Sequence, residues 1–433
     1  MANSRQFRSL TLGLSVGTAT GALAVAIVFM LTVVASPAAQ AQTFQIIHAF
    51  TGKQDGGWPY AGVTIDKSGN LYGTTYAFGA NDKGAVFKMS KLKGGNWALH
   101  PIYIFTGGSD GGWPAARVIF GPNGTLYGTT QIGGNGYGTV FQLTPPPTAC
   151  TTALCPWRET VLYAFKGAPD CGNRATSSFG ELIFDQAGNI YGTTYNGGVN
   201  DEGCVYKLTP SGSGGYTESV IHSFGGGSDG YFPFTGVILD STGNLYGTTS
   251  TGGQSVYYGT VYQLVPSTGG YTENILYSFK GGSDGGNPFG GLIFDSSGNL
   301  YGSTEDGGPG GAGTAFELTR AGNGKWSHTA LYSFTGGGDY NGPYASFVMD
   351  GAGNLYGTTW GSGANRLGNV FKLTRAIQPP WNYTSLHDFT GSDGLNPISN
   401  VTFDASGNLY GTTSGGDNGN CDGGCGVVWE ITP

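Results

Sequence analysis

One aspartate recurs at the same place in each of seven similar segments of the sequence. The set comprises Asp55, Asp110, Asp170, Asp229, Asp284, Asp339 and Asp393. Carboxylate oxygens are ligands of Ca²⁺, so a ring of them could hold an ion or draw a cationic ligand. Each aspartate could instead accept hydrogen bonds from the backbone of its own Gly-rich turn. We expect the structural role, because a residue that every segment needs alike belongs to the construction of the segment; Ca²⁺ is the alternative.

Charged residues interrupt the similarity of the segments at one position, which opens an apolar strand. We assign to it Gly62, Gly236 and Gly291 in three segments, and Arg117, Glu181, Phe347 and Asn400 in the other four. Arg117 and Glu181 belong to consecutive segments. They either form an ion pair that closes a gap or supply the polar element of a binding site.

Aromatic residues are also distributed unevenly among the segments. Trp58, Trp113 and the pair Tyr231-Phe232 directly precede a proline in the Gly-rich loop that contains the aspartate. Tyr257, Tyr258 and Trp360 lie in the loop that follows the GTT segment. Exposed rings among Asn, Asp and Gly suit stacking on sugars or on peptide side chains. The alternative is that the rings wedge between structural units. As ligand-binding candidates we take Trp58, Trp113, Arg117, Glu181, Phe232, Tyr258 and Trp360.

The histidines give no support to an enzyme. His48, His222 and His387 stand where other segments have Tyr in LYSF, and His100 and His328 lie on similar stretches. No G-x-S-x-G, H-E-x-x-H or phosphate loop occurs in the sequence. We therefore assign no catalytic residue and no organic cofactor. A lyase or hydrolase that uses the aspartates with Arg117 and Glu181 is the alternative from another class.

Six cysteines favour disulfides over a metal site. The pairs we predict are Cys150–Cys155, Cys171–Cys204 and Cys421–Cys425. Zinc is the competing interpretation of CDGGC at 421–425, but no His or second Cys pair accompanies it. Disulfides indicate an exported protein.

The elements that must position these residues repeat along the chain. GNLYGTT occurs at 69–75, 243–249, 353–359 and 407–413, and close variants occur at 124–130, 188–194 and 298–304. A period of about 55 residues is typical of propellers, solenoids and arrays. A solenoid would need distinct polar caps at its ends, and none is visible.

Each repeat predicts four short antiparallel strands. In the fifth repeat these are ENILYSF (273–279), GLIFD (291–295), NLYGST (299–304) and TAFELT (314–319). The GLIFD-type strand is apolar on consecutive positions, so we expect it innermost and buried on both faces. The ILYSF-type strand is then outermost. The sequence predicts an all-β, seven-bladed β-propeller over 42–433, with the inter-blade loops and the loops after GTT on one face.

The ends of the chain predict how the ring closes. FQIIHAF (44–50) is an outer-type strand that precedes the first inner strand, and VVWEIT (427–432) ends the last repeat. The first strand should complete the last blade and remove an exposed edge. Within GNLYGTT, Leu71 and Tyr72 should point to opposite sides, and Gly73 should admit an aromatic ring of an adjacent blade.

The first 41 residues resemble a secretory leader. Basic residues precede an apolar stretch at 21–35, and Ala39-Gln40-Ala41 offers a cleavage site. An uncleaved membrane anchor is the alternative. We expect a secreted, periplasmic or cell-surface protein after cleavage, with no membrane insertion of the mature chain. The net charge of −8 without a basic cluster argues against nucleic acid.

The repeat resembles the GloVer tandem-repeat family, through S-F-x-G-G-x-D-G, G-N-L-Y-G-T-T and G-T-V-F-x-L. The resemblance covers 44–433 and implies an exported bacterial protein without defined catalytic residues. Many members carry a C-terminal anchor, whereas this sequence ends at Pro433 directly after a strand. We expect a monomeric binding or interaction module for an extracellular glycan or protein, possessing a site on the long-loop face. A purely structural surface protein is a further alternative.

Overall fold

The computed structural model describes residues 42–146, 157–172, 180–212, 215–335, 342–417 and 419–433. Residues Thr43–Thr432 form one compact unit. The predicted leader (1–41), the Cys150–Cys155 pair and Asp339 lie outside the described residues. A search of the described part for a helix long and apolar enough to cross a membrane finds none.

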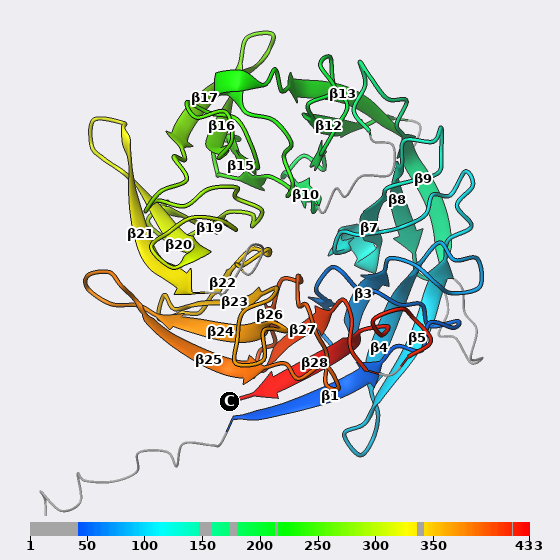
Figure 1. Ribbon diagram of the computed structural model, residues 1–433. Helices are drawn as coiled ribbons and strands as arrows, with labels where there is room; N and C mark the ends of the chain where they lie inside the picture. Colours follow the sequence, from blue (N-terminus) through cyan, green and yellow to red (C-terminus); the bar gives the residue numbers. More distant parts are fainter. Residues whose placement is uncertain (1–41, 147–156, 173–179, 213–214, 336–341, 418) are drawn as a thin grey trace, which may run out of the picture. The chain divides into compact units, whose positions relative to one another are not determined.

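The unit Thr43–Thr432 consists of seven four-stranded antiparallel sheets arranged in a ring (Figure 1). We number them as blades 1 to 7 in chain order, so that blade 1 contains β2–β5 and blade 7 contains β26–β28 with β1. In every blade the GLIFD-type strand is at one edge and the ILYSF-type strand at the other. The predicted seven-bladed β-propeller is confirmed.

The innermost strands are β2 (Thr64–Ile65), β6 (Ile119–Phe120), β10 (Ile183–Phe184), β14 (Ile238–Leu239), β18 (Ile293–Phe294), β22 (Val348–Met349) and β26 (Thr402–Phe403). The second strands are β3 (Leu71–Thr75), β7 (Leu126–Thr130), β11 (Ile190–Thr194), β15 (Leu245–Thr249), β19 (Leu300–Ser303), β23 (Leu355–Thr359) and β27 (Leu409–Thr413). The third strands are β4 (Ala85–Lys91), β8 (Thr139–Thr144), β12 (Cys204–Pro210), β16 (Thr260–Ser267), β20 (Gly311–Arg320), β24 (Asn369–Thr374) and β28 (Val427–Thr432). The outermost strands are β5 (Trp97–Ile104), β9 (Arg158–Ala164), β13 (Tyr216–Ser223), β17 (Gly270–Ser278), β21 (Trp326–Thr335), β25 (Asn382–Asp388) and β1 (Thr43–Ala49). Two short 3₁₀ helices, η1 (Pro122–Gly124) and η2 (Gly227–Asp229), lie in connections.

The ring closes through the first strand of the unit. β1 pairs antiparallel with β28, from Thr43 opposite Thr432 to Ala49 opposite Val427. In Figure 1 the blue β1 runs beside the red β28 as the outer strand of the last blade. The predicted closure is confirmed, and it leaves no blade with a missing outer strand.

The turn between the first and second strands explains most of the repeated motif. In blade 1, Asp66 accepts bonds from the backbone N–H groups of Ser68 (2.8 Å) and Asn70 (2.9 Å). It also accepts bonds from the Asn70 amide (2.8 Å) and the Tyr72 hydroxyl (3.1 Å). Burial alone would raise the pKa of Asp66, but these donors hold it below its usual value. The same carboxylate pattern recurs at Asp185, Asp240, Asp295, Asp350 and Asp404.

The second strand alternates between two blade interfaces. Leu71 packs in the cluster shared with blade 7, and Tyr72 packs in the cluster shared with blade 2, as predicted. The prediction for Gly73 was wrong in one respect: the ring that approaches it is Phe87, directly opposite on β4 of the same blade. A Cβ at Gly73 would lie 2.5 Å from Phe87 Cζ. Glycine therefore lets a strand pair bury its own aromatic ring.

The innermost strands are less buried than predicted. Each has only two residues in the ladder, and all of these residues are half-buried. The residue before each strand is the buried one, as at Val63, Val118 and Leu182. The innermost strand borders a cavity, so one of its faces has no neighbouring sheet.

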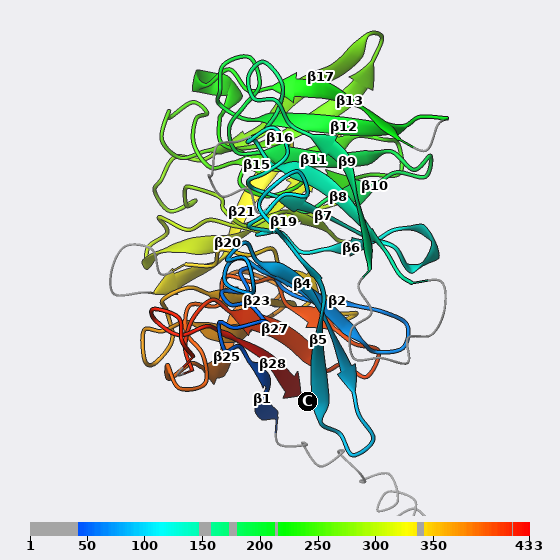
Figure 2. The same ribbon diagram turned by 90° about the vertical axis from the view of Figure 1, so that its right-hand side faces the viewer.

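The two loop classes meet on one face of the ring. Isolated β-bridges join the inter-blade loop to the loop after the second strand, as between Gly57 and Ala77 or between Gly112 and Ile132. The Cys171–Cys204 disulfide links the inter-blade loop of blade 3 to the start of β12. Seen from the side, the strands run from one face of the ring to the other, so that their connections gather at its two faces (Figure 2).

Candidate ligand-binding cavity

A cavity of about 790 Å³ lies where the innermost strands meet. Its wall includes one aliphatic side chain from the innermost strand of each of blades 2 to 6: Ile119, Ile183, Ile238, Ile293 and Val348. These are the first residues of β6, β10, β14, β18 and β22. Volumes of 300–1,000 Å³, roughly, are usual for small-molecule sites, and so is a mostly apolar lining.

One polar cluster crosses this apolar cavity. Arg117 Nη2 donates to Glu181 Oε2 at 2.7 Å, and both side chains are about one quarter exposed. The second carboxylate oxygen, Oε1, accepts a 2.5 Å bond from Asn400 Nδ2 of blade 7. Arg117 Nη1 also donates to Thr402 Oγ1 at 3.3 Å. Arg117 and Glu181 thus form an ion pair, which was one alternative. They also line a cavity, as the other alternative, a polar element of a binding site, requires.

Three of the seven residues that open the innermost strands are glycine for a steric reason. The strand register shows that blade 6 contributes Ser346, because Val348 pairs with Tyr356 as Thr64 pairs with Tyr72. The assignment of Phe347 was therefore wrong by one residue. A Cβ at Gly62 would lie 2.1 Å from the carbonyl oxygen of Asn400. Similar clashes would occur between Gly236 and Glu181 O (2.2 Å) and between Gly291 and Ser346 Oγ (2.4 Å).

Aromatic residues form the mouth of the cavity. Tyr60, Phe234 and Tyr344 come from inter-blade loops, and Trp360 follows the second strand of blade 6. Phe289 connects two of them, since it packs edge-on against Phe234 (centroids 4.6 Å apart) and stacks on Tyr344 (5.3 Å). Tyr344 in turn contacts Trp360 at 5.8 Å. The result is an arc of rings over blades 4 to 6.

A buried acid lies behind this arc. Glu305 is 1% exposed, and its carboxylate accepts a hydrogen bond from the Tyr344 hydroxyl. Burial raises the pKa of Glu305 to about 7, although the bond from Tyr344 acts in the opposite direction. Glu305 thereby fixes the orientation of a ring that lines the mouth.

Of the ligand-binding candidates from the sequence, Arg117, Glu181 and Trp360 line the cavity. Trp58 and Trp113 lie elsewhere. The Trp58 indole donates to Gly424 O (3.2 Å) and packs on Phe78, whereas Trp113 stacks on Tyr76 and under the ammonium group of Lys83. Both tryptophans therefore contact the loops of the preceding blade.

Phe232 and Tyr258 are likewise between blades. Phe232 stacks on Tyr195 of blade 3 with centroids 4.5 Å apart. Tyr258 packs against the loop of blade 5, where a Cβ at Gly281 would lie 2.2 Å from its ring. Its neighbour Tyr257 is 68% exposed. These contacts match the wedging alternative.

The cavity aromatics that sequence reasoning missed follow the loop proline instead of preceding it. They stand in W-P-Y, F-P-F and G-P-Y at Tyr60, Phe234 and Tyr344. The signal was present, because the residue after Pro is two positions before the strand-opening residue. Side chains two apart on an extended chain face the same way.

The six recurring aspartates that the structure describes do not line the cavity. Each described one caps its own loop: Asp55 accepts bonds from Thr51 N (2.9 Å) and Thr51 Oγ1 (2.6 Å), and Asp110 does the same with Thr106. Asp170, Asp284 and Asp393 also accept backbone N–H groups four or three residues earlier. In the part of the chain that the structure describes, no three of them form a cation-binding group.

Two predicted disulfides are present, Cys171–Cys204 and Cys421–Cys425. In the second pair both sulfurs of CDGGC are bonded to each other, which argues against the zinc interpretation of this segment. It lies against the first inter-blade loop, since Gly52 has both sulfurs within about 3.0 Å of its Cβ position.

The ring of sheets and its central cavity define the class of protein, a seven-bladed β-propeller. The chain belongs to the Gloeobacter/Verrucomicrobia repeat family, whose model matches residues 18–156 and 153–336. This match confirms the family that the motifs indicated.

Comparison with solved structures gives a distant similarity. A crystal structure of a Thermus thermophilus protein, assigned as an oxidoreductase (glucose dehydrogenase), has 15% sequence identity and a TM-score of 0.44. The alignment covers 90% of this chain and 100% of that chain. No curated protein matches the sequence.

Proposed function

We propose that the chain is an exported binding module whose central cavity takes a neutral, hydroxyl-rich ligand, such as the end of an extracellular glycan. The observation that carries this proposal is the aromatic mouth, Tyr60, Phe234, Tyr344 and Trp360, over a cavity of about 790 Å³. Sugar C–H faces stack on such rings, and the hydroxyls need donors and acceptors close by.

The polar cluster favours a neutral ligand over a charged one. The charges of Arg117 and Glu181 neutralise each other at 2.7 Å, so the cavity offers hydrogen-bonding groups without a net charge. An anionic ligand would have to displace Glu181 from the guanidinium, and a cationic ligand would have to displace Arg117. The two disulfides support export to an oxidising compartment.

A glycan array with the purified protein, followed by calorimetry on any hit, tests the proposal. We expect Tyr344→Ala and Trp360→Ala each to weaken binding about tenfold or more, equivalent to about 1.4 kcal/mol. Trp113→Ala is the matched control, because Trp113 belongs to the same loop class but does not line the cavity. Equal losses in all three variants, or no glycan hit, would refute the site.

The lyase or hydrolase alternative has a separate outcome in the same experiment. Incubation of the hit with the protein would release product if a reaction occurs, and retention without turnover would favour the binding module. The purely structural alternative predicts neither retention nor turnover.

A further inference from the structure

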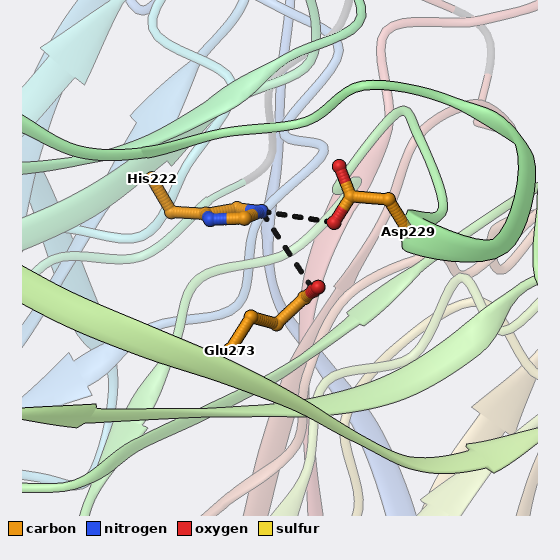
Figure 3. Close-up of side chains that lie close together, drawn as sticks. All are labelled: His222, Asp229 and Glu273. Atoms are coloured by element: carbon orange, nitrogen blue, oxygen red, sulfur yellow. Dashed lines mark hydrogen bonds and ion pairs between the residues drawn. The ribbon is translucent and has the colours of Figure 1, made fainter.

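Three potential metal ligands converge at the outer rim, away from the cavity. His222 lies near the end of β13 of blade 3, Asp229 lies in η2, and Glu273 is on β17 of blade 4. Their side chains point toward one another from three different elements (Figure 3). One ligand atom from each lies within 4.8 Å of the other two.

The distances fit a first coordination shell. His222 Nε2 is 3.2 Å from Asp229 Oδ1 and 3.7 Å from Glu273 Oε1. Tetrahedral Zn²⁺, with bonds of about 2.0–2.1 Å to nitrogen and oxygen, holds its ligand atoms about 3.3 Å apart. The two distances from His222 are within a few tenths of an ångström of this spacing, and the two carboxylate oxygens lie within 4.8 Å of each other.

Two further observations are compatible with metal ligation, although both also occur at the rims of other blades. Glu273 Oε1 is buried and accepts no hydrogen bond within the described chain, as is also true of Glu159 Oε1 and Glu218 Oε1. The other oxygen of Asp229, Oδ2, accepts the backbone N–H of Gly225, which orients Oδ1 toward His222. Such an outer-shell bond is typical of a carboxylate that ligates a metal.

The rim of the other blades provides an internal comparison. The first position is a residue near the end of an outer strand, and the second is the loop aspartate. The third is the residue of the next outer strand that pairs with a Leu, Ile or Met of the third strand. The other fully described triplets are Tyr103–Asp110–Glu159, Tyr163–Asp170–Glu218, Tyr277–Asp284–His328, His48–Asp55–Leu99 and His387–Asp393–Phe44.

None of these described triplets combines one imidazole with two carboxylates. Tyr103 and Tyr163 donate their hydroxyls to the loop aspartate at 3.1 and 2.8 Å, which satisfies the carboxylate without an ion. His48 and His387 pair with an aspartate alone, at 3.3 and 2.9 Å. The second carboxylate is what distinguishes the His222 rim from a simple ion pair.

We propose that His222, Asp229 and Glu273 bind one divalent transition-metal ion at the rim between blades 3 and 4. The ligand types select the metal class: imidazole with carboxylates suits Zn²⁺ and its neighbours, whereas Ca²⁺ and Mg²⁺ prefer oxygen ligands alone. The three side chains are 15–25% exposed, so the ion can enter from solvent and keep a water molecule as its fourth ligand.

Calorimetric titration of the chain with Zn²⁺, after chelator dialysis and without a histidine tag, tests this proposal. We expect one saturable site and a melting temperature that rises with Zn²⁺ concentration. His222→Tyr recreates the triplet found at Tyr103 and Tyr163, so it should fold, and it should weaken Zn²⁺ binding by about 100-fold. His387→Tyr is the matched control and should bind as the original chain does.

A second variant and a Co²⁺ spectrum test the same site independently of His222→Tyr. Glu273→Gln preserves the size of the side chain and should also weaken Zn²⁺ binding, even if His222→Tyr were to fold poorly. Co²⁺ should give a visible spectrum in the original chain that is lost in Glu273→Gln. Absence of saturable binding, or a loss in His387→Tyr as large as in His222→Tyr, would overturn the proposal.

Discussion

The second strand of each blade and the inter-blade loop differ in how much their residues vary among the seven blades. The second strand keeps LYGTT or LYGS in nearly every blade, since each residue has a fixed neighbour: a leucine toward one blade, a tyrosine toward the other, and a glycine under an aromatic ring. The inter-blade loop keeps its aspartate, and in every blade except blade 3 a proline after it, but changes most of its other residues. Constant positions therefore build the ring, and variable positions occupy its cavity and rim.

The largest expected loss of unfolding free energy comes from Gly411→Ala, a substitution in a second strand. A Cβ there would lie 2.3 Å from Trp429, whose side chain is fully buried. Overpacking of this kind costs about 3 kcal/mol of unfolding free energy. Gly351→Ala is the control, because nothing lies within 4 Å of its Cβ position and the other blades have a larger residue there. Denaturant unfolding should show a loss for Gly411→Ala alone, and equal stability of the two variants would contradict the assignment.

The turn that precedes the second strand should give the next largest effect. Asp240→Ala removes the acceptor of bonds from Thr242, Asn244 and the Tyr246 hydroxyl. We expect a loss of about 2 kcal/mol, measured by denaturant unfolding. Asp240→Asn should lose less, because the amide oxygen can still accept the backbone N–H groups. An Asn variant as unstable as the Ala variant would mean that charge, not bond count, determines this turn.

The residue before the loop proline should show a smaller, conformational effect. Trp113 has φ = 57°, a left-handed conformation that bulky residues rarely adopt, and Asn287 has φ = 54° at the same position in blade 5. Asn tolerates this conformation better than Ala. Trp113→Asn should therefore be about 1 kcal/mol more stable than Trp113→Ala, although both lose the contact with Tyr76. Thermal melts of the pair measure the difference, and the reverse order would remove the backbone explanation.

The smallest expected effect is the pH dependence of the rim. Burial, and then the charge of the neighbouring loop aspartate, raise the pKa of Glu159 and of Glu218 to about 7. A folded-state pKa above the unfolded value of 4.5 means that stability is fully present below about pH 4.5 and is lost as pH rises through about 7. The double variant Glu159→Gln with Glu218→Gln should melt like the original chain at pH 5 and about 1 °C higher at pH 8. An equal shift at both pH values would argue for a change in packing.

The repeats allowed much of the fold to be predicted. Blade number, strand order, the D-x-x-G-N turn and closure by FQIIHAF all followed from a motif with a period of about 55 residues, and all are confirmed. The burial of the innermost strands was predicted wrongly. Their apolar run indicated burial on both faces, but an apolar side chain that faces a cavity has the same sequence pattern.

The site was predicted less completely. Arg117, Glu181 and Trp360 were found because they break the repetition, and the structure brings all three to the cavity. The sequence-based prediction did not include Tyr60, Phe234 and Tyr344, because it used the residue before the loop proline. That residue and the residue after proline lie on the same loop, but the first contacts the preceding blade and the second faces the cavity.

The sequence by itself determined the blades, because each blade except the last is built from contacts between residues that are close along the chain. Only the tertiary structure decided which variable residues meet. Glu181 and Asn400 are 219 residues apart and belong to non-adjacent blades, yet they share a hydrogen bond in the cavity. Likewise, Glu273 reaches His222 only because two outer strands lie side by side. Such meetings depend on how the ring closes, and a repeat pattern specifies each blade without specifying which side chains the closed ring brings together.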